Sequence, residues 1–182
     1  MKIQYCVENI KSFVELLRVR NCVIASIGVL IGAFFVYLGG DPVIDARIIM
    51  AVTATFLIAG GGNVINDYFD VEIDKINKPH RPISSGRVSR SDAFMFSMAL
   101  FLVGVGLSKG INDHCLVIGG LNTTLLIFYG AYSKRIGFLS NIIIGYLVAS
   151  IFLFGVLSTL TGGLESIPPD EAKIVAILAG CA

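Results

Sequence analysis

Charged residues are scarce in this sequence, and neither sign is in clear excess. Lys and Arg number 14 and Asp and Glu 13, so that 15% of the 182 residues are charged and the formal net charge is +1. This balance gives no support to nucleic-acid binding, which needs a basic surface. Hydrophobic residues make up 55% of the chain, and the mean hydropathy of +0.81 exceeds what a soluble domain of this length needs for its core. The composition therefore indicates a membrane protein.

Several other patterns are missing. The four cysteines stand far apart, without a CxxC pair or a neighbouring histidine, so we expect small buried side chains and no cysteine metal site. The first twenty residues are charged and carry regularly spaced apolar residues, and they lack the apolar block of a cleavable signal peptide. We expect this stretch to lie along the membrane surface. No D-G-x-x-A-R sequence occurs, which argues against a CDP-alcohol phosphotransferase.

Long apolar stretches dominate what is present. Each is long enough, at about 20 residues, to cross a bilayer as a helix. The five complete stretches are residues 21–39, 46–66, 93–109, 115–132 and 141–160, and a sixth begins near Glu171. The predicted fold class is an all-α integral membrane protein, a multi-span helical bundle of five full spans and the start of a sixth.

Basic residues are concentrated in three of the polar segments between these spans. The segments are the N-terminal stretch, residues 67–92 and residues 132–140, whereas the intervening loops are acidic or nearly neutral. Lys and Arg favour the cytoplasmic side of a membrane. We therefore expect a multi-pass protein of the cell membrane with all three basic segments in the cytoplasm.

Three consecutive glycines, Gly60, Gly61 and Gly62, interrupt the second span. In a helix interior each glycine sacrifices about 1 kcal/mol of helix propensity. Most glycines in membrane helices allow close helix packing. We expect the bare backbone at this triplet to face a neighbouring helix or a ligand.

The segment GGGNVINDYFDVEIDKINKPHRPISSGRVS continues directly from the second span and carries an acidic stripe. Asn66, Asp70 and Asp74 recur every four residues, which places them on one slowly drifting helix face at steps of about 6 Å. Asn63 and Asp67 lie on the flank of that face. A charged residue at the bilayer centre costs about 2.5–3.5 kcal/mol, and less near the interface. The stripe therefore needs a compensating partner.

Hard oxygen ligands at this spacing suit Mg²⁺, which takes one or two carboxylates, several waters and substrate phosphates. Cations that could hold a phosphate follow at Lys75, Lys78, Arg81 and Arg87. These residues predict a magnesium-diphosphate site. The structural alternative is a solvated helix end with i,i+4 ion pairs. It explains Glu72 and Lys75, but it leaves the gathering of Asn and Asp on one side unexplained.

The motif NDYFDVEID resembles the first aspartate-rich motif, N-D-x-x-D-x-x-x-D, of the UbiA superfamily of intramembrane prenyltransferases. NKPHRPISSG resembles the basic tail that accompanies this motif, and LLRVRNCVIASIGVLIGA and YSKRIGFLSN are similar to first-helix and fourth-loop signatures of the family. The resemblance covers most of the chain. It implies a prenyltransferase in which two such motifs hold Mg²⁺ around a prenyl diphosphate, within a fold of nine helices.

Carried over residue by residue, the resemblance assigns a metal-binding set and a substrate-binding set. The metal ligands or their supports would be Asn66, Asp67, Asp70 and Asp74, with Asp70 and Asp74 as the catalytic pair. The substrate-binding residues would be Asn21, Asn63, Lys78, Arg81, Lys134 and Arg135. For Lys134 and Arg135 the alternative is the ordinary excess of basic residues in cytoplasmic loops.

The second acidic motif, which the family carries after its sixth helix, does not occur in this sequence. We expect residues 1–182 to form a single transmembrane prenyltransferase domain that lacks its C-terminal part, with residues 67–92 as its cytoplasmic active-site loop. A truncated product, a fragment and one part of a split protein remain as alternatives.

Two segments of the sequence suggest which substrate accepts the prenyl group. RNCVIASIGVLIGA and NDYFDVEIDKINKP are most similar to archaeal members that transfer a geranylgeranyl group to geranylgeranylglyceryl phosphate in ether-lipid synthesis. Arg18, Arg20 or Lys134 could hold the phosphate of such an acceptor. An aromatic acceptor in quinone or chlorophyll biosynthesis is the alternative. An ion-coupled transporter using Asp70 or Asp74 is a second one, although transporter sites lie near the midplane and this stripe runs out into a basic loop.

Overall fold

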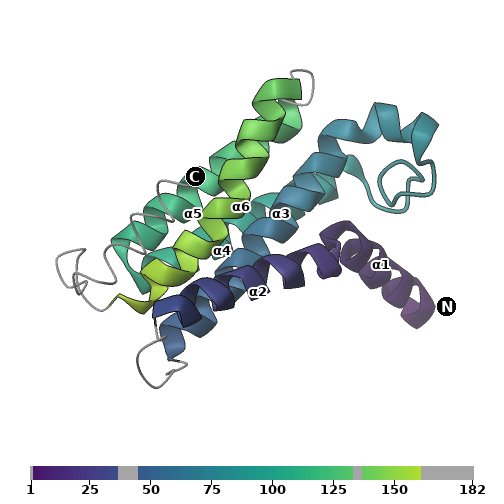
Figure 1. Cartoon of the computed structure of the whole chain (residues 1–182). Coiled ribbons are helices and arrows are strands. Elements are labelled where there is room, and N and C mark those ends of the chain that lie inside the picture. Colours follow the sequence, from purple (N-terminus) through teal and green to yellow (C-terminus); the bar gives the residue numbers. More distant parts are fainter. Residues whose placement is uncertain (1, 37–44, 133–136, 161–182) are drawn as a thin grey trace.

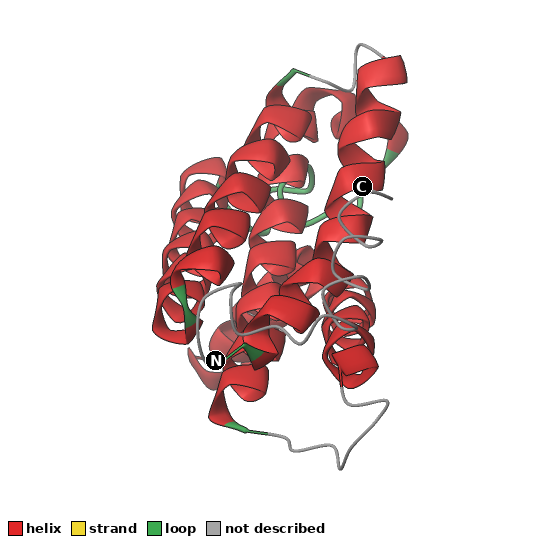
Figure 2. Cartoon of the chain, turned by 60° about the vertical axis from the view of Figure 1, so that its left-hand side comes forward, coloured by secondary structure: helices red, strands yellow, loops and turns green. Residues whose placement is uncertain are grey.

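The computed structural model describes residues 2–36, 45–132 and 137–160, and nearly all of them are helical. The helices are α1 (Lys2–Leu17), α2 (Val19–Val36), α3 (Ala46–Asn77), α4 (Arg90–Ile111), α5 (Asp113–Ala131) and α6 (Gly137–Thr159). No strand occurs within these ranges (Figure 2). The helices α2 to α6 form a bundle, and α1 turns away from it at the start of α2 (Figure 1). This confirms the expected all-α class.

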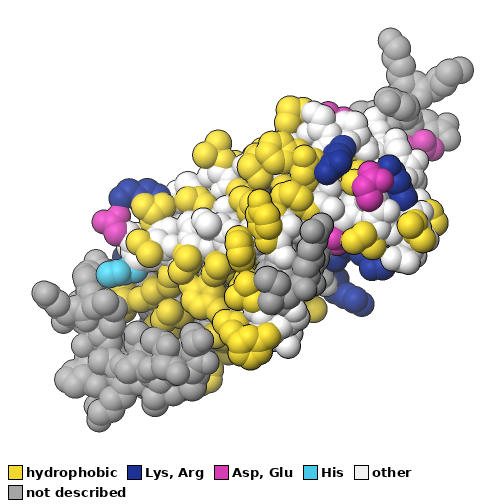
Figure 3. Space-filling view, turned by 90° about the horizontal axis from the view of Figure 1, so that it is seen from above, with side chains coloured by type: hydrophobic (Ala, Val, Ile, Leu, Met, Phe, Trp, Pro, Cys, Tyr) yellow, Lys and Arg dark blue, Asp and Glu magenta, His cyan; other side chains and the backbone are white. Residues whose placement is uncertain are grey.

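The five helices α2 to α6 are each long and apolar enough to cross a membrane. They coincide with the five predicted spans, whereas the sixth, expected near Glu171, lies outside the described residues. In the space-filling view, apolar side chains cover the middle of the visible face and charged side chains gather towards its two ends (Figure 3). The chain is therefore a multi-pass membrane protein.

The helix α3 is longer than a bilayer requires. Its 32 residues extend about 48 Å at 1.5 Å per residue, whereas the hydrocarbon core of a bilayer is about 30 Å thick. The acidic stripe lies on the C-terminal part of this helix, which ends at Asn77. The segment 67–92, expected as a loop, is therefore helical at both ends, and the connection between α3 and α4 is limited to residues 78–89.

Contacts at glycine bring α2 and α6 close together. A Cβ atom placed on Gly32 would overlap the carbonyl of Phe152, and one placed on Gly155 would overlap the carbonyl of Val29. Each helix thus presents a glycine to the backbone of the other. Small residues permit this kind of approach between membrane helices, and any larger residue would force the pair apart.

The glycine triplet in α3 packs against three neighbouring elements. A Cβ on any of the three would lie within 2.9 Å of a side chain on another helix. The contacts pair Gly60 with Leu17, Gly61 with Phe101, and Gly62 with Leu126. The expectation that this bare backbone serves close packing is confirmed, because α1, α4 and α5 all approach α3 at the same level.

At the end of the bundle opposite α1, polar side chains form hydrogen bonds with backbone groups at the helix ends. Asn112 caps α5 by accepting a hydrogen bond from the Cys115 amide at 2.8 Å, and its own amide donates to the Leu157 carbonyl at 2.8 Å. Arg47 Nη1 donates to the Leu160 carbonyl at 3.0 Å. The last carbonyls of a helix have no partner within it. These contacts therefore tie the end of α6 to its neighbours.

Candidate functional site

Two aspartates of α3 and two arginines form a connected network at the end of the bundle that carries α1. Arg81 Nη1 donates to Asp67 Oδ1 at 2.9 Å and also to Asp74 Oδ2. Arg18 Nη2 donates to the same oxygen of Asp67 at 2.5 Å. Asp67 and Asp74 are only 5% and 4% exposed, so the arginines compensate two buried carboxylates. This part of the stripe faces basic residues, as the sequence pattern requires.

The connection 78–89 brings Arg81 back onto α3. The Lys78 amide still bonds the Asp74 carbonyl at 2.8 Å, after which the chain reverses. The Ser85 amide donates to the Arg81 carbonyl at 2.8 Å, and the Val88 amide donates to the Pro82 carbonyl at 3.0 Å. The reversal passes through Gly86 at φ 76°, a conformation that glycine adopts without steric cost. The loop is thus a compact hydrogen-bonded turn that presents Arg81 to the aspartates.

Arg18 forms the joint between α1 and α2. Its φ of 51° lies in the left-handed region, which residues other than glycine rarely occupy unless their surroundings hold them there. Asn63 Nδ2 fixes the joint by donating to the Leu17 carbonyl at 2.8 Å. The sequence suggested Arg18 only for an acceptor phosphate. Nothing in its spacing indicated a contact with Asp67, which lies 49 residues further along the chain.

Asn66 supplies an oxygen without a donor. Its Oδ1 atom is buried and has no hydrogen-bond partner among the residues described, an uncommon situation for a buried acceptor. Asp70 follows one turn later on the same helix face and is half-buried. At this level α5 approaches closely, because a Cβ on Gly130 would lie 3.8 Å from the Asn66 Cα. An amide oxygen beside carboxylates is a hard donor set of the kind that Mg²⁺ prefers.

The described ranges contain no group of three or more His, Cys, Asp or Glu side chains already arranged to hold a metal ion. Mg²⁺ does not require such a group, because it commonly takes one or two protein carboxylates and completes its shell with water and phosphate oxygens. The chemistry of the donors therefore fits magnesium bound together with a phosphate ligand. In this structure two of the candidate carboxylates instead accept hydrogen bonds from Arg18 and Arg81.

The other expected site residues differ in their positions. Lys78 is exposed at the end of α3, and Asn21 is exposed in the first turn of α2. Asn63 lies within the site region, where it holds the joint at Arg18. Lys134 and Arg135 lie outside the described residues. The structure thus brings Arg81 to the aspartates and leaves Lys78 beside them at the surface.

Glu72 and Lys75 fit the alternative interpretation of this segment, a solvated helix end with ion pairs. Lys75 Nζ lies 3.0 Å from Glu72 Oε1, and both side chains are exposed. An exposed pair three residues apart on a helix contributes little beyond local helix stability. The ion-paired helix end therefore describes these two residues, and the buried aspartates belong to a different environment on the same helix.

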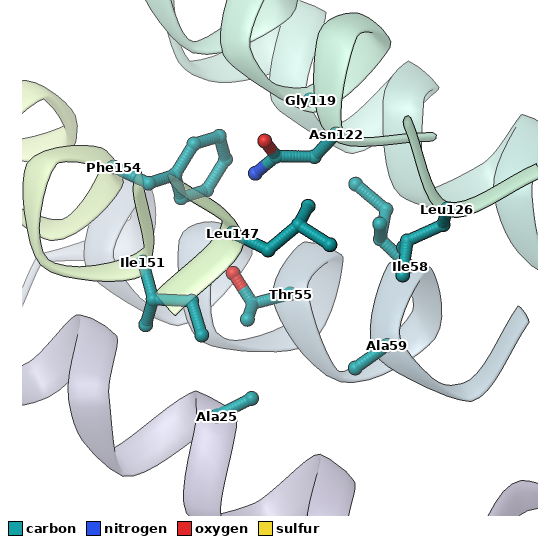
Figure 4. Close-up of a pocket in the computed structure, with 10 residues that line it drawn as sticks. All are labelled: Ala25, Thr55, Ile58, Ala59, Gly119, Asn122, Leu126, Leu147, Ile151 and Phe154. Carbon is teal, nitrogen blue, oxygen red and sulfur yellow. The ribbon is translucent and has the colours of Figure 1, made fainter. Parts of the chain in front are cut away.

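An apolar pocket lies inside the bundle between α2, α3, α5 and α6 (Figure 4). Thr55 and Ala59 line it from α3, and Asn122 on α5 is its polar wall. The Asn122 amide donates to Ser150 Oγ at 2.9 Å, which joins α5 to α6. At 100° per residue, Thr55 and Ala59 lie within about 20° of the direction of Asn66 around α3. Asn66 therefore continues the face of α3 that lines the apolar pocket.

These features define a polytopic membrane protein with a charged network near one end of its helix bundle and an apolar pocket within the bundle. Residues 25–182 match the UbiA prenyltransferase family, and the chain belongs to this family.

The chain is similar to archaeal proteins of known name. The chain is 41% identical over 171 residues to a digeranylgeranylglyceryl phosphate synthase of Methanosarcina mazei, covering 87% of this chain and 58% of that protein. It is 41% identical over 145 residues to the synthase of the same name from Methanopyrus kandleri, covering 80% of this chain and 52% of that protein. The chain thus spans little more than half of the length of these relatives.

Solved structures agree with the fold. A structure from work on digeranylgeranylglyceryl phosphate synthase in membranes superposes with a TM-score of 0.82 at 38% identity, over 94% of this chain and 57% of that one. A UbiA homologue from Aeropyrum pernix K1, without bound ligand, superposes with a TM-score of 0.71 at 20% identity, over 90% of this chain and 59% of that one. The second likeness supports the fold alone.

Proposed function

We propose that this chain serves magnesium-dependent transfer of a geranylgeranyl group from its diphosphate to geranylgeranylglyceryl phosphate, a step of archaeal ether-lipid synthesis. The observation that carries the proposal is the continuous face of α3. Thr55 and Ala59 line the apolar pocket, and Asn66 follows about 10 Å further along the same face. A prenyl diphosphate has the same order, because its apolar chain ends in a charged group.

The C-terminal part of α3 and the connection that follows it have suitable groups for both metal and phosphate. Asn66, Asp67, Asp70 and Asp74 would hold Mg²⁺, which when bound neutralises the departing diphosphate and favours ionisation of the allylic carbon–oxygen bond. Arg81, which now bonds Asp67 and Asp74, has guanidinium donors suited to two phosphate oxygens at once.

The remaining cationic and amide residues complete the proposed substrate site. Lys78 is close enough in sequence to Arg81 to act on the same diphosphate as a point charge. Lys134 and Arg135 are proposed for the same role, since they follow α5, whose C-terminal end approaches α3 at Asn66. Asn21 and Asn63 would line the cavity entrance near the α1–α2 joint.

The apolar pocket would house the prenyl chain and keep water from the allylic carbon. Its walls come from four helices, and its lining is mainly aliphatic and aromatic. Ile151 and Phe154 of α6 face the lining residues of α3 across the pocket (Figure 4). Water exclusion matters for this reaction because a developing carbocation would otherwise be hydrolysed before it reached the acceptor.

The acceptor is proposed from the relatives. The proteins named above as digeranylgeranylglyceryl phosphate synthases are 41% identical to this chain, which favours a lipid phosphate over an aromatic acceptor. The position of the charges disfavours a transporter, because Asp67 and Asp74 pair with arginines near the end of the bundle and α3 continues beyond them. We also propose that α1 and the connection 78–89 lie on the cytoplasmic side of the cell membrane, as the distribution of Lys and Arg suggests.

Binding of geranylgeranyl diphosphate to the purified chain in lipid nanodiscs, with and without Mg²⁺, tests the proposal. We expect saturable binding that requires Mg²⁺ and weakens at least about tenfold in Asp70→Asn, the size of one lost charge-assisted interaction. Asp113→Asn is the matched control, because Asp113 is exposed at the other end of the bundle. Binding that is indifferent to Mg²⁺ and to both substitutions would contradict the proposal.

The acceptor is tested by product formation. The chain, or a version extended to the length of its relatives, is incubated with labelled geranylgeranyl diphosphate and either geranylgeranylglyceryl phosphate or an aromatic acid acceptor. We expect an ether product from the lipid phosphate alone. Product from the aromatic acid alone would replace the proposed acceptor while preserving the transferase assignment. Ion uptake into vesicles that ignores prenyl diphosphates would instead support the transporter.

A further inference from the structure

Arg87, in the connection 78–89, joins that connection to α1 through its guanidinium group. Its Nη1 and Nη2 atoms donate to the two carboxylate oxygens of Glu15 at 2.8 and 3.2 Å. Nη1 also reaches Ser12 Oγ at 3.4 Å. Arginine has five N–H donors in a planar fork, and a bidentate contact of this kind fixes orientation as well as distance. The fork therefore sets how the loop sits on α1.

The same guanidinium also holds the loop internally. Nε donates to Ser85 Oγ at 3.1 Å, and Nη2 donates to the His80 carbonyl at 2.7 Å. His80 immediately precedes Arg81, whose side chain bonds Asp67 and Asp74. A displacement of Arg87 would therefore be transmitted through one peptide unit to the residue that contacts the acidic stripe.

Apolar packing reinforces this arrangement. Leu16 of α1 and Ile83 and Val88 of the loop belong to one buried cluster, together with Val71 of α3. Leu16 is fully buried, and Ile83 and Val88 are 7% and 4% exposed. The loop thus rests on α1 through both a buried cluster and a polar fork. The cluster holds the two elements together, and the directional bonds of the fork add a constraint on their relative orientation.

We propose that Arg87 is a positioning residue of the site and that Glu15 of α1 is its partner. By fixing the loop against α1, the pair sets the position of Arg81 relative to Asp67 and Asp74. Helix α1 is therefore part of the site's construction even though the charges that contact the stripe come from elsewhere. For its effect on ligand binding, this inference rests on the proposed function. The effect of the pair on the order of the loop is independent of the proposed function.

Two measurements on the full chain in nanodiscs test the pair. Hydrogen exchange reports the backbone amides of 81–88 that are bonded within the loop, and titration with geranylgeranyl diphosphate and Mg²⁺ reports the site. Both side chains are partly exposed, at 43% and 45%, and exposed pairs contribute less than buried ones. We therefore expect Arg87→Ala, Arg87→Lys and Glu15→Gln each to accelerate loop exchange and to weaken binding by up to about fivefold. Lysine should fail because it keeps the charge but lacks the fork.

The controls separate positioning from charge and from general damage. Lys109→Ala removes another exposed ion pair, with Asp113 at 2.5 Å, and should change neither measurement. The exchanged pair Glu15→Arg with Arg87→Glu should recover part of both losses, since the cross-helix contact is restored with opposite polarity. Recovery in the double variant would show that the losses in the single variants arise from the broken contact between positions 15 and 87.

Specific outcomes would overturn the inference. Unchanged loop exchange in Arg87→Ala would mean that the fork does not order the loop. Full binding by Arg87→Lys would mean that charge alone matters. Loss with Arg87→Ala but none with Glu15→Gln would mean that Arg87 acts without α1. Absence of prenyl diphosphate binding in the unmodified chain would refute the proposed function instead, and the exchange measurement would still decide whether Arg87 and Glu15 order the loop.

Discussion

Arg18 Nη2 lies 2.5 Å from Asp67 Oδ1, across 49 residues of sequence. The contact joins the turn between α1 and α2 to the buried side of α3. Asp67 is 5% exposed, and its Oδ1 atom also accepts a hydrogen bond from Arg81 Nη1 at 2.9 Å. One carboxylate thus anchors two arginines from different parts of the chain, and much of the local electrostatic balance depends on it.

We expect Asp67→Asn to destabilise the protein by about 1–3 kcal/mol, because it keeps the side-chain volume but leaves the two arginines without their shared charge. Unfolding in mixed micelles of increasing denaturing detergent measures the loss. Asp113→Asn, which alters an exposed pair at the other end, should leave the transition in place. Equal stability of Asp67→Asn and the unmodified chain would show that the network is not stabilising.

The close approach of α2 and α6 makes a second prediction. Gly155→Ala would place a methyl group against the Val29 carbonyl, and we expect a cost of about 1–3 kcal/mol from overpacking. Gly145→Ala is the matched control on the same helix, because a Cβ there meets nothing within 4 Å. Thermal unfolding in detergent compares the two. Gly145→Ala should be neutral or slightly stabilising, because alanine has the higher helix propensity. An equal loss in both variants would contradict a specific effect of the contact between α2 and α6.

Asn112 has two separable functions. Asn112→Ala removes both the cap on α5 and the bond to the Leu157 carbonyl, and we expect a loss of about 1–2 kcal/mol. Asn112→Asp keeps the oxygen that caps the helix and loses the donor, so its loss should be smaller. The order of the two melting temperatures provides the measurement. If aspartate were as damaging as alanine, the contact with α6 would account for the whole effect.

The proposed orientation can be checked by labelling. In a background with all four cysteines replaced by serine, Ser91→Cys places an exposed thiol in the first turn of α4, and Asp113→Cys places one at the start of α5. We expect a membrane-impermeant maleimide to reach Asp113→Cys in intact cells and Ser91→Cys only after the membrane is opened. The reverse pattern would place the connection 78–89 outside the cell.

Magnesium should stabilise the chain only together with its ligand. Because Arg18 and Arg81 already compensate Asp67 and Asp74, we expect chelation by EDTA to leave the melting temperature of the ligand-free chain unchanged. With geranylgeranyl diphosphate at about 100 times its dissociation constant, EDTA should remove up to about 2.7 kcal/mol of ligand stabilisation. A large shift without the diphosphate would indicate a metal site independent of substrate.

The sequence predicted the helices well, because each apolar stretch had the length of a membrane span and polar residues at both ends. It also predicted that the glycines at 60–62 would face a neighbouring helix or a ligand, and the structure places side chains of neighbouring helices against all three. The acidic stripe was visible because Asn66, Asp70 and Asp74 repeat at helical spacing. These features are local, and local spacing is what a single sequence records.

The pairing of the stripe could not be predicted in the same way. Arg18 and Asp67 meet only because α1 and α2 bend at a left-handed residue, and Asn63 bonds the carbonyl at that bend. The sequence assigned Asn63 to the cavity lining, a role that remains a proposal, and gave no sign of its structural bond. The sequence indicated Arg87 only as one cation among several. Its five hydrogen bonds depend on the fold of a turn that passes through Gly86.

Helix α3 runs without a break from Ala46 to Asn77, and it therefore fixes the distances between the groups along it. The rise per residue fixes how far the pocket at Ala59 lies from the oxygen of Asn66, and no flexible joint between them can stretch or shorten that interval. Insertion of a single residue there would turn Asn66 by about 100° and break its alignment with the pocket. Changes in ligand length must therefore be accommodated by the helices opposite, or at the far end of the pocket.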